Sequence, residues 1–341
     1  MVSPNIRTIL KIGTTQIPLS NDFVNENFYF GLKKDKNFSN RGFLKIENKA
    51  FMFVDAILKV AGFTRSIHSI SRNFGSQKVD RGAATLFFIN DEGWALTCKH
   101  VAQWISQAEV INKRFAQYQN ESRGLSTSLS KTVANKLGLN ETQTGEMRIT
   151  FVDCVNQIMN IRFFLHPEYD LALMKFEGFT KMSTTGFPVF KEKDEEVQPG
   201  QMLCRLGFPF PEFSNFHLNL ETDQLEWINS GQPRSPRFPM EGMMTRFLGD
   251  NNGKVYGIEM STPGLRGQSG GPLFDADGII VGMQTRTKHL HLGFDIEDKE
   301  VIAHGKVKKI NDYAFIHLGE CIHVSILKEF MTQHGVSFQK G

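Results

Sequence analysis

A serine lies inside a glycine-rich turn in the last third of the chain. Residues 264–271 read Gly-Leu-Arg-Gly-Gln-Ser-Gly-Gly, so Ser269 stands between Gly267 and Gly270. Glycines permit a tight turn with positive φ and let a substrate carbonyl approach the backbone. Such a turn can aim two amides at the oxygen of a tetrahedral intermediate, each worth about 3 kcal/mol. We expect the amides of Gly267 and Ser269 to form this oxyanion hole. A simple β-turn is the alternative that the loop alone leaves open.

A serine hydroxyl is a weak nucleophile unless a base removes its proton and a carboxylate orients that base. Two upstream segments supply these residue types. His100 follows the β-rich run 94–97, and Asp170 precedes the alternating apolar run 171–176. The chain order is therefore histidine, aspartate, serine, as in the chymotrypsin arrangement and unlike that of subtilisins or α/β-hydrolases. We predict that Ser269 attacks, His100 transfers the proton and Asp170 orients the imidazole.

Four segments surround or follow these residues: Gly93-Trp-Ala-Leu-Thr-Cys-Lys-His-Val101, Tyr169-Asp-Leu-Ala-Leu-Met-Lys175, Gln198-Pro-Gly-Gln201 with Leu206-Gly-Phe-Pro209, and Gly278–Thr285. Together they resemble the trypsin/chymotrypsin-fold serine peptidases, and in particular the protease domain of the HtrA (Deg) group without a PDZ domain. The resemblance implies a mainly β fold with two six-stranded antiparallel barrels. It also implies catalysis without a metal or an organic cofactor.

The resemblance implies a peptidase domain over residues 81–335, with the second barrel beginning near residue 185. The stretch between His100 and Asp170 is longer than the barrel strands need. Apolar residues recur there at steps of three and four, which predicts an amphipathic helix: Trp104, Ala108, Ile111, Phe115 and Tyr118. A second helix is expected over 126–139. We expect a helical insertion over about 103–142 that packs on the first barrel, and a lid or regulatory arm is the alternative.

Residues 1–80 have no counterpart in the minimal peptidase. They contain a hairpin candidate over 7–18 and a helix candidate over 50–61 whose apolar residues nearly encircle it. A helix of this kind must pack against something, so we expect the extension to dock on the peptidase. A helix that binds a regulatory partner or joins copies into a homo-oligomer is the alternative. Only six residues follow Gly335, so we expect no PDZ domain.

The residue before the serine bears on activation. Digestive trypsins carry an aspartate there, which pairs with a new amino terminus after cleavage, whereas this chain carries Gln268. We therefore predict that activity depends on the order of the oxyanion loop, set by neighbouring loops, a partner or a ligand. Proteolytic maturation is not expected.

The resemblance also suggests which residues bind substrate: Pro263, Leu265, Gln284, Thr285, Arg286 and Thr287. Pro263 stands where trypsins carry the aspartate that captures lysine or arginine, so a basic preference loses its usual residue. Thr285 matches the position whose hydroxyl supports the catalytic aspartate. Arg286 either favours acidic substrate side chains or faces solvent.

The composition argues against some classes of function. The 341 residues are 40% hydrophobic and 22% charged, and a net charge of +3 gives no general attraction to nucleic acid or anionic membranes. No apolar run approaches the roughly 18 residues of a membrane span, and the first residues lack a signal-peptide core. We expect a cytoplasmic protein, with secretion that needs no signal peptide as the alternative.

The residues that could bind metal are scattered. Four cysteines without a Cys-x-x-Cys pair are expected to be buried thiols: Cys98, Cys154, Cys204 and Cys321. Three histidines in a polar insertion lack a tight ligand spacing and are expected at the surface: His289, His291 and His304. We expect no metal site.

The sequence therefore predicts a serine endopeptidase that hydrolyses protein or peptide substrates through an acyl-enzyme. A catalytically latent or inactive peptidase-fold binding or scaffold module is one alternative, because a fold does not imply a function. An esterase that uses the same triad is another.

Overall fold

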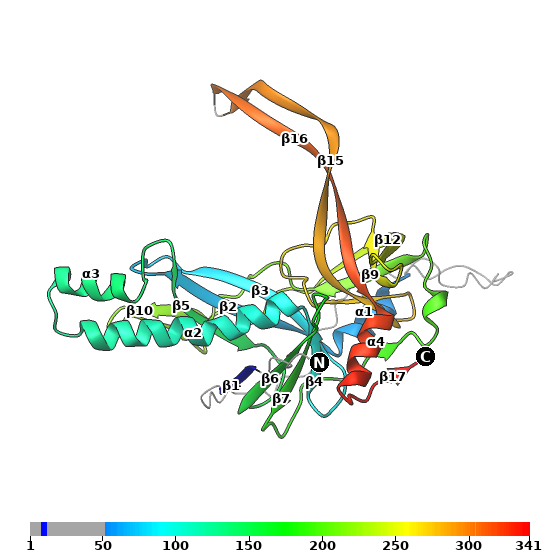
Figure 1. The fold of residues 1–341 in the computed structure, drawn as a ribbon, viewed down its shortest axis with the longest axis horizontal. Coiled ribbons are helices and arrows are strands. Elements are labelled where there is room, and N and C mark those ends of the chain that lie inside the picture. The colour runs from blue at the N-terminus through cyan, green and yellow to red at the C-terminus, as the bar shows by residue number, and fades with distance from the viewer. Residues whose placement is uncertain (1–7, 12–51, 304) are drawn as a thin grey trace, which may run out of the picture.

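The computed structural model describes residues 8–11, 52–303 and 305–341. It is mainly β, and its two sheets curl into barrel-like halves (Figure 1), which confirms the expected fold class. One large apolar core is shared by the two halves, with Phe87 from the first and Phe274 from the second among its members. The site described below is built where these halves meet. Of the hairpin expected over 7–18, only 8–11 lie within the described residues.

The first sheet has seven antiparallel strands in the order β1-β6-β7-β4-β3-β2-β5. Their bounds are β1 Thr8–Lys11, β2 Thr64–Asn73, β3 Asp80–Phe88, β4 Trp94–Thr97, β5 Thr144–Phe151, β6 Asn160–Leu165 and β7 Ala172–Glu177. Strand β2 pairs with both β3 and β5, although its residues fall in the stretch that sequence reasoning assigned to an amino-terminal extension. The first half therefore begins before residue 81.

The composition of β2 explains why it is hard to recognise. Nearly all of its residues are buried, including several polar ones, so it lacks the alternation of a half-buried strand. Arg65 donates to the carbonyls of Ala61, Gly62, Thr64, Asp153 and Ser183. Arg72 pairs with Glu146 of β5 at 3.1 Å. Burial of these side chains is tolerable because their donors find acceptors.

The second sheet follows the order β14-β9-β12-β13-β16-β15-β8-β17, and an extra pairing joins β14 to β15. That pairing closes six strands into a barrel: β9 Met202–Gly207, β12 Phe238–Gly249, β13 Val255–Met260, β14 Pro272–Phe274, β15 Ile280–Ala303 and β16 Lys306–His323. The two-residue strands β8 (Val189–Phe190) and β17 (Gln339–Lys340) add to it in parallel. A separate hairpin joins β10 (Phe216–Asn219) to β11 (Gln224–Trp227).

Four α-helices lie within the described residues. Helix α1 (Val54–Ala61) and helix α4 (Val324–Gln333) pack their apolar residues into the shared core. Helix α2 (Lys99–Ser122) runs along the first sheet and α3 (Thr127–Lys136) follows it at the far end (Figure 1), in the region where a helical insertion is expected. Of the described helices, none has the length and apolar character to cross a bilayer.

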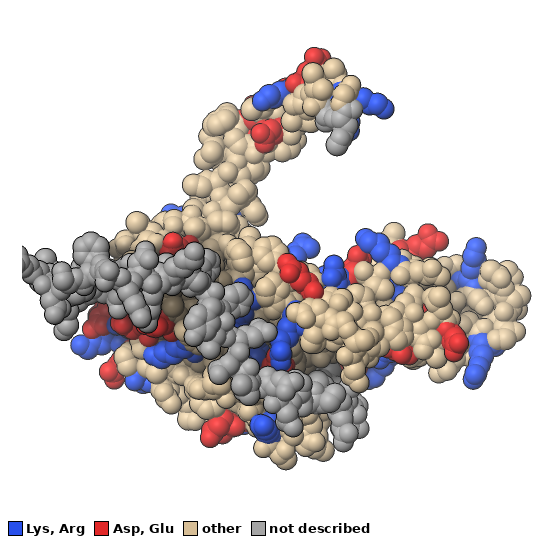
Figure 2. Space-filling model, turned by 180° about the vertical axis from the view of Figure 1, so that it is seen from behind, with Lys and Arg blue, Asp and Glu red and all other residues tan. Residues whose placement is uncertain are grey.

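Strands β15 and β16 continue far beyond the barrel as a two-stranded arm (Figure 1). Several apolar side chains of the arm are exposed: Leu292, Phe294, Ile296, Ile302, Val307, Ile310, Tyr313, Phe315 and Ile316. Figure 2 shows that the shaft of the arm carries little charge on this face, whereas lysine or arginine and acidic side chains gather toward its tip. The segment expected as a polar insertion is thus a β-ladder, with register shifts along it.

Candidate active site

His100 lies in the first turn of α2, directly after β4. The chain leaves β4 through Cys98, which has extended φ and ψ, and the helix begins at Lys99. Amides in the first turn of a helix have no partner within the helix. The His100 amide finds one outside it, because it donates to Oδ1 of Asp170 at 3.0 Å. Asp170 therefore holds the backbone of the residue whose side chain it also contacts.

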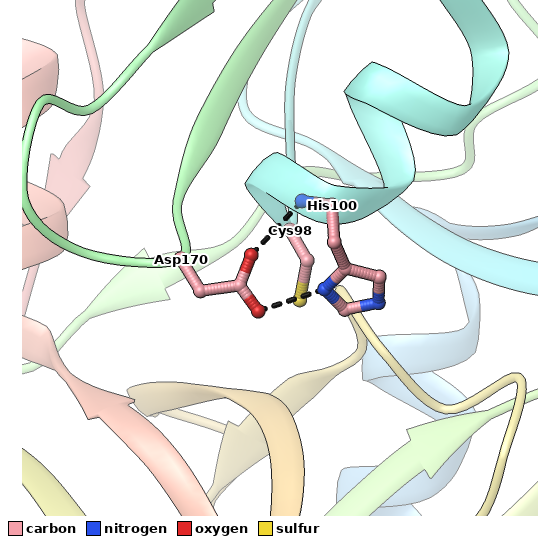
Figure 3. A group of neighbouring side chains, drawn as sticks. All are labelled: Cys98, His100 and Asp170. Atoms are coloured by element: carbon pink, nitrogen blue, oxygen red, sulfur yellow. Dashed lines mark hydrogen bonds and ion pairs between the residues drawn. The ribbon is translucent and has the colours of Figure 1, made fainter. Parts of the chain in front are cut away.

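The side chains of His100 and Asp170 form a hydrogen-bonded pair (Figure 3). Nδ1 of His100 lies 2.8 Å from Oδ2 of Asp170, and the histidine ring is about half exposed. Burial raises the pKa of Asp170. The hydrogen bonds from the ring and the amide of His100 together outweigh this effect, so the pKa of Asp170 lies below its usual value. An ionised carboxylate only accepts hydrogen bonds, which assigns the ring proton to Nδ1 and leaves Nε2 able to accept a proton.

Ser269 lies in a tight loop between β13 and β14. The amide of Gln268 donates to the carbonyl of Leu265 at 3.0 Å, and the amide of Gly271 donates to that of Gln268 at 2.8 Å. Gly267 has φ of +98°, and a Cβ there would lie 2.5 Å from the carbonyl oxygen of Phe208. Both observations require glycine at this position. The loop is thus held in one shape by its own backbone bonds.

The side chain of Gln268 also holds this loop. It is fully buried, its Oε1 accepts from the amide of Leu265 at 3.0 Å, and its Nε2 donates to the carbonyl of Phe238 at 3.2 Å. Sequence reasoning treated Gln268 only as a missing aspartate. Its side chain provides contacts that order the loop without an ion pair to an amino terminus.

The backbone amides of Gly267 and Ser269 have no acceptor within the described part of the chain. These are the amides expected to face an oxyanion. The Ser269 hydroxyl donates to the carbonyl of Thr285 at 3.2 Å. Among the described residues, it makes no hydrogen bond with His100.

Bonds across the two halves bring the pair and the loop together. The Gln284 carbonyl accepts from the thiol of Cys98 at 3.3 Å and from the amide of Gly270 at 2.9 Å. On β3, the Thr85 amide donates to the Ser269 carbonyl at 3.0 Å, and the Thr85 hydroxyl donates to the Gly267 carbonyl at 2.7 Å. Sequence reasoning missed Thr85, because nothing local marks a residue whose partners are so distant in the chain.

Comparison with known proteins gives the family of the chain. The family described as trypsin-like peptidase domain matches residues 84–283, more than half of the chain. The chain belongs to this family. No curated protein sequence matches it.

The solved structures similar to this trypsin-like domain include an HtrA-type protease AlgW with decapeptide, which is 13% identical with a TM-score of 0.42. That alignment covers 82% of this chain and 66% of AlgW. An HtrA-type protease AlgW with tripeptide is also 13% identical, with a TM-score of 0.41, and 83% of this chain and 64% of AlgW are covered. The chain therefore spans less than two thirds of the length of these structures.

The six residues expected to bind substrate flank the nucleophile loop of the trypsin-like domain. Pro263 and Leu265 are half-buried in the segment leading to Ser269, while Gln284 and Thr285 are buried on β15. The Thr287 hydroxyl donates to the Gly264 carbonyl at 2.6 Å, which joins the two segments.

Two expectations for these residues need correction or refinement. The Thr285 hydroxyl does not support Asp170, because it donates to the carbonyl of Glu320 at 2.9 Å. The pairing of β15 with β16 shifts register between Gln284 and Arg286, and such a bulge re-aims the side chains around it. Arg286 is exposed, as one alternative had it, and its guanidinium pairs with the carboxylate of Glu320.

Cys98, His100 and Asp170 form a group whose donor atoms all lie within 4.8 Å of one another (Figure 3). Two nitrogen or oxygen ligands of a tetrahedral zinc ion are about 3.3 Å apart. The 2.8 Å between Nδ1 and Oδ2 instead fits a hydrogen bond. Burial raises the pKa of the Cys98 thiol well above its usual value. The group therefore suits proton transfer better than metal binding.

The histidines of the polar insertion lie on the arm. His289 contacts His317 across the ladder, with 2.6 Å between the two Nδ1 atoms, and His291 contacts Asp295 at 2.6 Å. All four side chains are exposed, as expected for surface histidines. His304 lies outside the described residues.

Proposed function

We propose that this chain is a serine endopeptidase that cleaves protein or peptide substrates through an acyl-enzyme. Ser269 is the nucleophile, His100 the general base and then acid, and Asp170 the residue that orients the imidazole and stabilises its charged form. The amides of Gly267 and Ser269 receive the oxyanion. A mechanism in which the residues have these roles needs no metal or organic cofactor.

The observation that carries the proposal is the double contact between Asp170 and His100. One carboxylate oxygen accepts from the backbone amide and the other from the ring, at 3.0 and 2.8 Å. A carboxylate held at two points fixes both the tautomer and the orientation of the imidazole, which is what a general base requires. A purely structural cap of α2 would need only the contact with the amide.

The bond from Ser269 to Thr285 bears on the resting state. In the proposed cycle, the hydroxyl leaves the Thr285 carbonyl by rotation about χ1 and donates to Nε2 of His100 when substrate binds. Hydrogen bonds of catalytic groups are often poorly aligned before substrate arrives. Activity then depends on loop order, supported here by Gln268 and Thr85, and not on cleavage of the amino terminus.

Labelling with a fluorophosphonate probe tests the proposal, with mass spectrometry to locate the modified residue. Wild type should be labelled at Ser269, Ser269→Ala should not be labelled, and His100→Ala should react at least about 10³-fold more slowly, because the base is lost. Ser230→Ala, which removes an exposed hydroxyl from another loop, is the matched control and should react like wild type.

Substrates separate the remaining alternatives. Cleavage of a proteome-derived peptide library supports an endopeptidase. Hydrolysis of small esters alone would indicate an esterase. A folded wild type that is neither labelled nor able to cleave would refute the proposal in favour of a binding module.

A further inference from the structure

Arg205 lies on β9 with its side chain inside the second barrel, and it is fully buried. Its Nη1 donates to Oε1 of Gln284 at 2.6 Å. Its Nη2 donates to the carbonyl of Thr262 at 3.1 Å and to the Thr262 hydroxyl at 2.5 Å. Its Nε has no hydrogen-bond partner among the described residues. No role in the proposed proton transfer accounts for this side chain.

The charge of Arg205 is not neutralised within the described part of the chain. All its acceptors are neutral oxygens, and no carboxylate lies within ion-pair distance. Burial lowers the pKa of Arg205, with only two thiols acting against that effect. Arg72, which is similarly buried, pairs with Glu146 and Asp223. A buried cation without a counter-charge is costly, and Arg205 leaves its Nε without a partner, unlike Arg65, whose three guanidinium nitrogens all donate to carbonyls. Its retention therefore suggests that an anion reaches it.

The position of Arg205 relative to Ser269 indicates which anion. Thr262 begins the segment that leads to the nucleophile loop, and Gln284 precedes Thr285, whose carbonyl accepts from the Ser269 hydroxyl. These two segments flank Ser269, and both are bonded to the guanidinium. On β16, Gly319 pairs with Thr287, and a Cβ at Gly319 would collide with Nη1 of Arg205. Glycine at this position leaves the room that the guanidinium occupies.

We propose that Arg205 forms the base of the subsite for the substrate residue on the acyl side of the scissile bond, and that this subsite selects acidic side chains. The inference rests on the proposed function, because it needs Ser269 to define where the scissile carbonyl lies. A side chain attached next to that carbonyl and entering between the two segments points toward Gln284 and Arg205.

The guanidinium of Arg205 can bind a carboxylate with two parallel hydrogen bonds. In the free protein, neutral oxygens of Gln284 and Thr262 take these donors. A substrate carboxylate would replace them and supply the missing charge. Because Arg205 lies behind Gln284, glutamate should reach it better than the shorter aspartate. Arg286 is less suited to this role, since Glu320 already neutralises it.

The test uses fluorogenic peptides that differ only at the acyl-side residue: Glu, Asp, Gln, Leu or Lys. For wild type, kcat/KM should be about 10- to 100-fold higher for Glu than for the isosteric Gln, as expected for a hydrogen-bonded buried charge pair. Arg205→Met should abolish the difference between Glu and Gln. Arg246→Met removes an exposed arginine from the same barrel, and it should retain the preference.

A second variant tests the same proposal if Arg205→Met does not fold. Gln284→Glu keeps the shape of the side chain but places a carboxylate on Nη1 of Arg205. This internal acid should occupy the guanidinium and lower the preference for Glu over Gln by at least about 10-fold. Thermal unfolding and fluorophosphonate labelling of both variants show whether the fold and the nucleophile persist.

Binding to Ser269→Ala separates this inference from the proposed function. Peptides with a carboxyl-terminal Glu or Gln, which mimic the acyl-side product, are titrated by calorimetry. Tighter binding of the Glu peptide supports the acidic subsite whether or not wild type is labelled. Absence of labelling would refute only the role of Ser269 as nucleophile. Equal binding, or a wild type that is labelled but favours Gln, Leu or Lys, overturns the acidic subsite and leaves the nucleophile standing.

Discussion

Replacement of His68 by phenylalanine should flatten the pH dependence of folding stability. His68 lies on β2 and is fully buried, with its ring stacked on Phe213 at 4.1 Å and its Nε2 2.9 Å from the hydroxyl of Ser235. Burial lowers the pKa of His68 from 6.5 to about 4, and Asp153 opposes this only in part. A phenylalanine keeps a ring for the stack but cannot titrate.

The direction of the effect follows from proton binding. The unfolded chain binds a proton at residue 68 near pH 6.5, whereas the folded chain binds it only near pH 4. Between these values the unfolded state holds more protons, so the stability contributed by neutral His68 is fully present above pH 6.5 and is lost as the pH falls from 6.5 to 4. At about 1.4 kcal/mol per pH unit, His68 should remove about 2.5 kcal/mol of stability between pH 8 and pH 4.5.

Urea unfolding at these two pH values measures this loss. Trp227 reports on the site by fluorescence, since its ring lies 5.6 Å from that of Phe213. Other carboxyl and histidine groups also titrate, so the quantity to compare is the loss in wild type minus the loss in His68→Phe. His217→Gln, at a half-exposed position on β10, is the control and should resemble wild type. Parallel losses in wild type and His68→Phe would refute the reasoning.

Two further predictions concern the site. Thr85→Val removes the hydroxyl that donates to the Gly267 carbonyl and accepts from the Phe208 amide, so fluorophosphonate labelling of Ser269 should slow by about 10-fold or more. Thr85→Ser keeps the hydroxyl and should restore the labelling rate. A wild-type rate for Thr85→Val would contradict this positioning role. The four cysteines are buried and unpaired, and burial raises their pKa values, so native protein should resist iodoacetamide at pH 8 while denatured protein reacts at all four. Modification of native Cys98, detected by mass spectrometry, would show that the site opens.

Local sequence was sufficient to predict the parts of the site that depend on neighbouring residues. The run before His100 forms β4, the run after Asp170 forms β7, and the glycines around Ser269 form a tight loop. Each of these signals acts over a few residues, where strand alternation and glycine geometry determine the backbone. The assignment of the mainly β fold rested on the same short segments.

Contacts between distant segments could not be predicted in this way. Thr85 and Arg205 each lie in an ordinary strand, and their roles arise only when β3 and β9 meet the nucleophile loop and β15. The misassigned hydroxyl of Thr285 has a related cause, because one register shift in the β15–β16 ladder decides where it points. Strand β2 was overlooked since its buried side chains are polar and find their partners far along the chain.

The bonds from Thr85 to the nucleophile loop also impose an order of events on synthesis. A ribosome makes His100, Asp170 and all strands of the first sheet before it reaches Ser269, and the second barrel closes only once β16 has been made as far as His323. Domains emerging from the ribosome tend to fold from the amino terminus onward. A nascent chain therefore carries the His100–Asp170 pair with no serine beside it while residues 171–268 are added. The complete site exists only after the chain has been made past His323 and its two halves have docked.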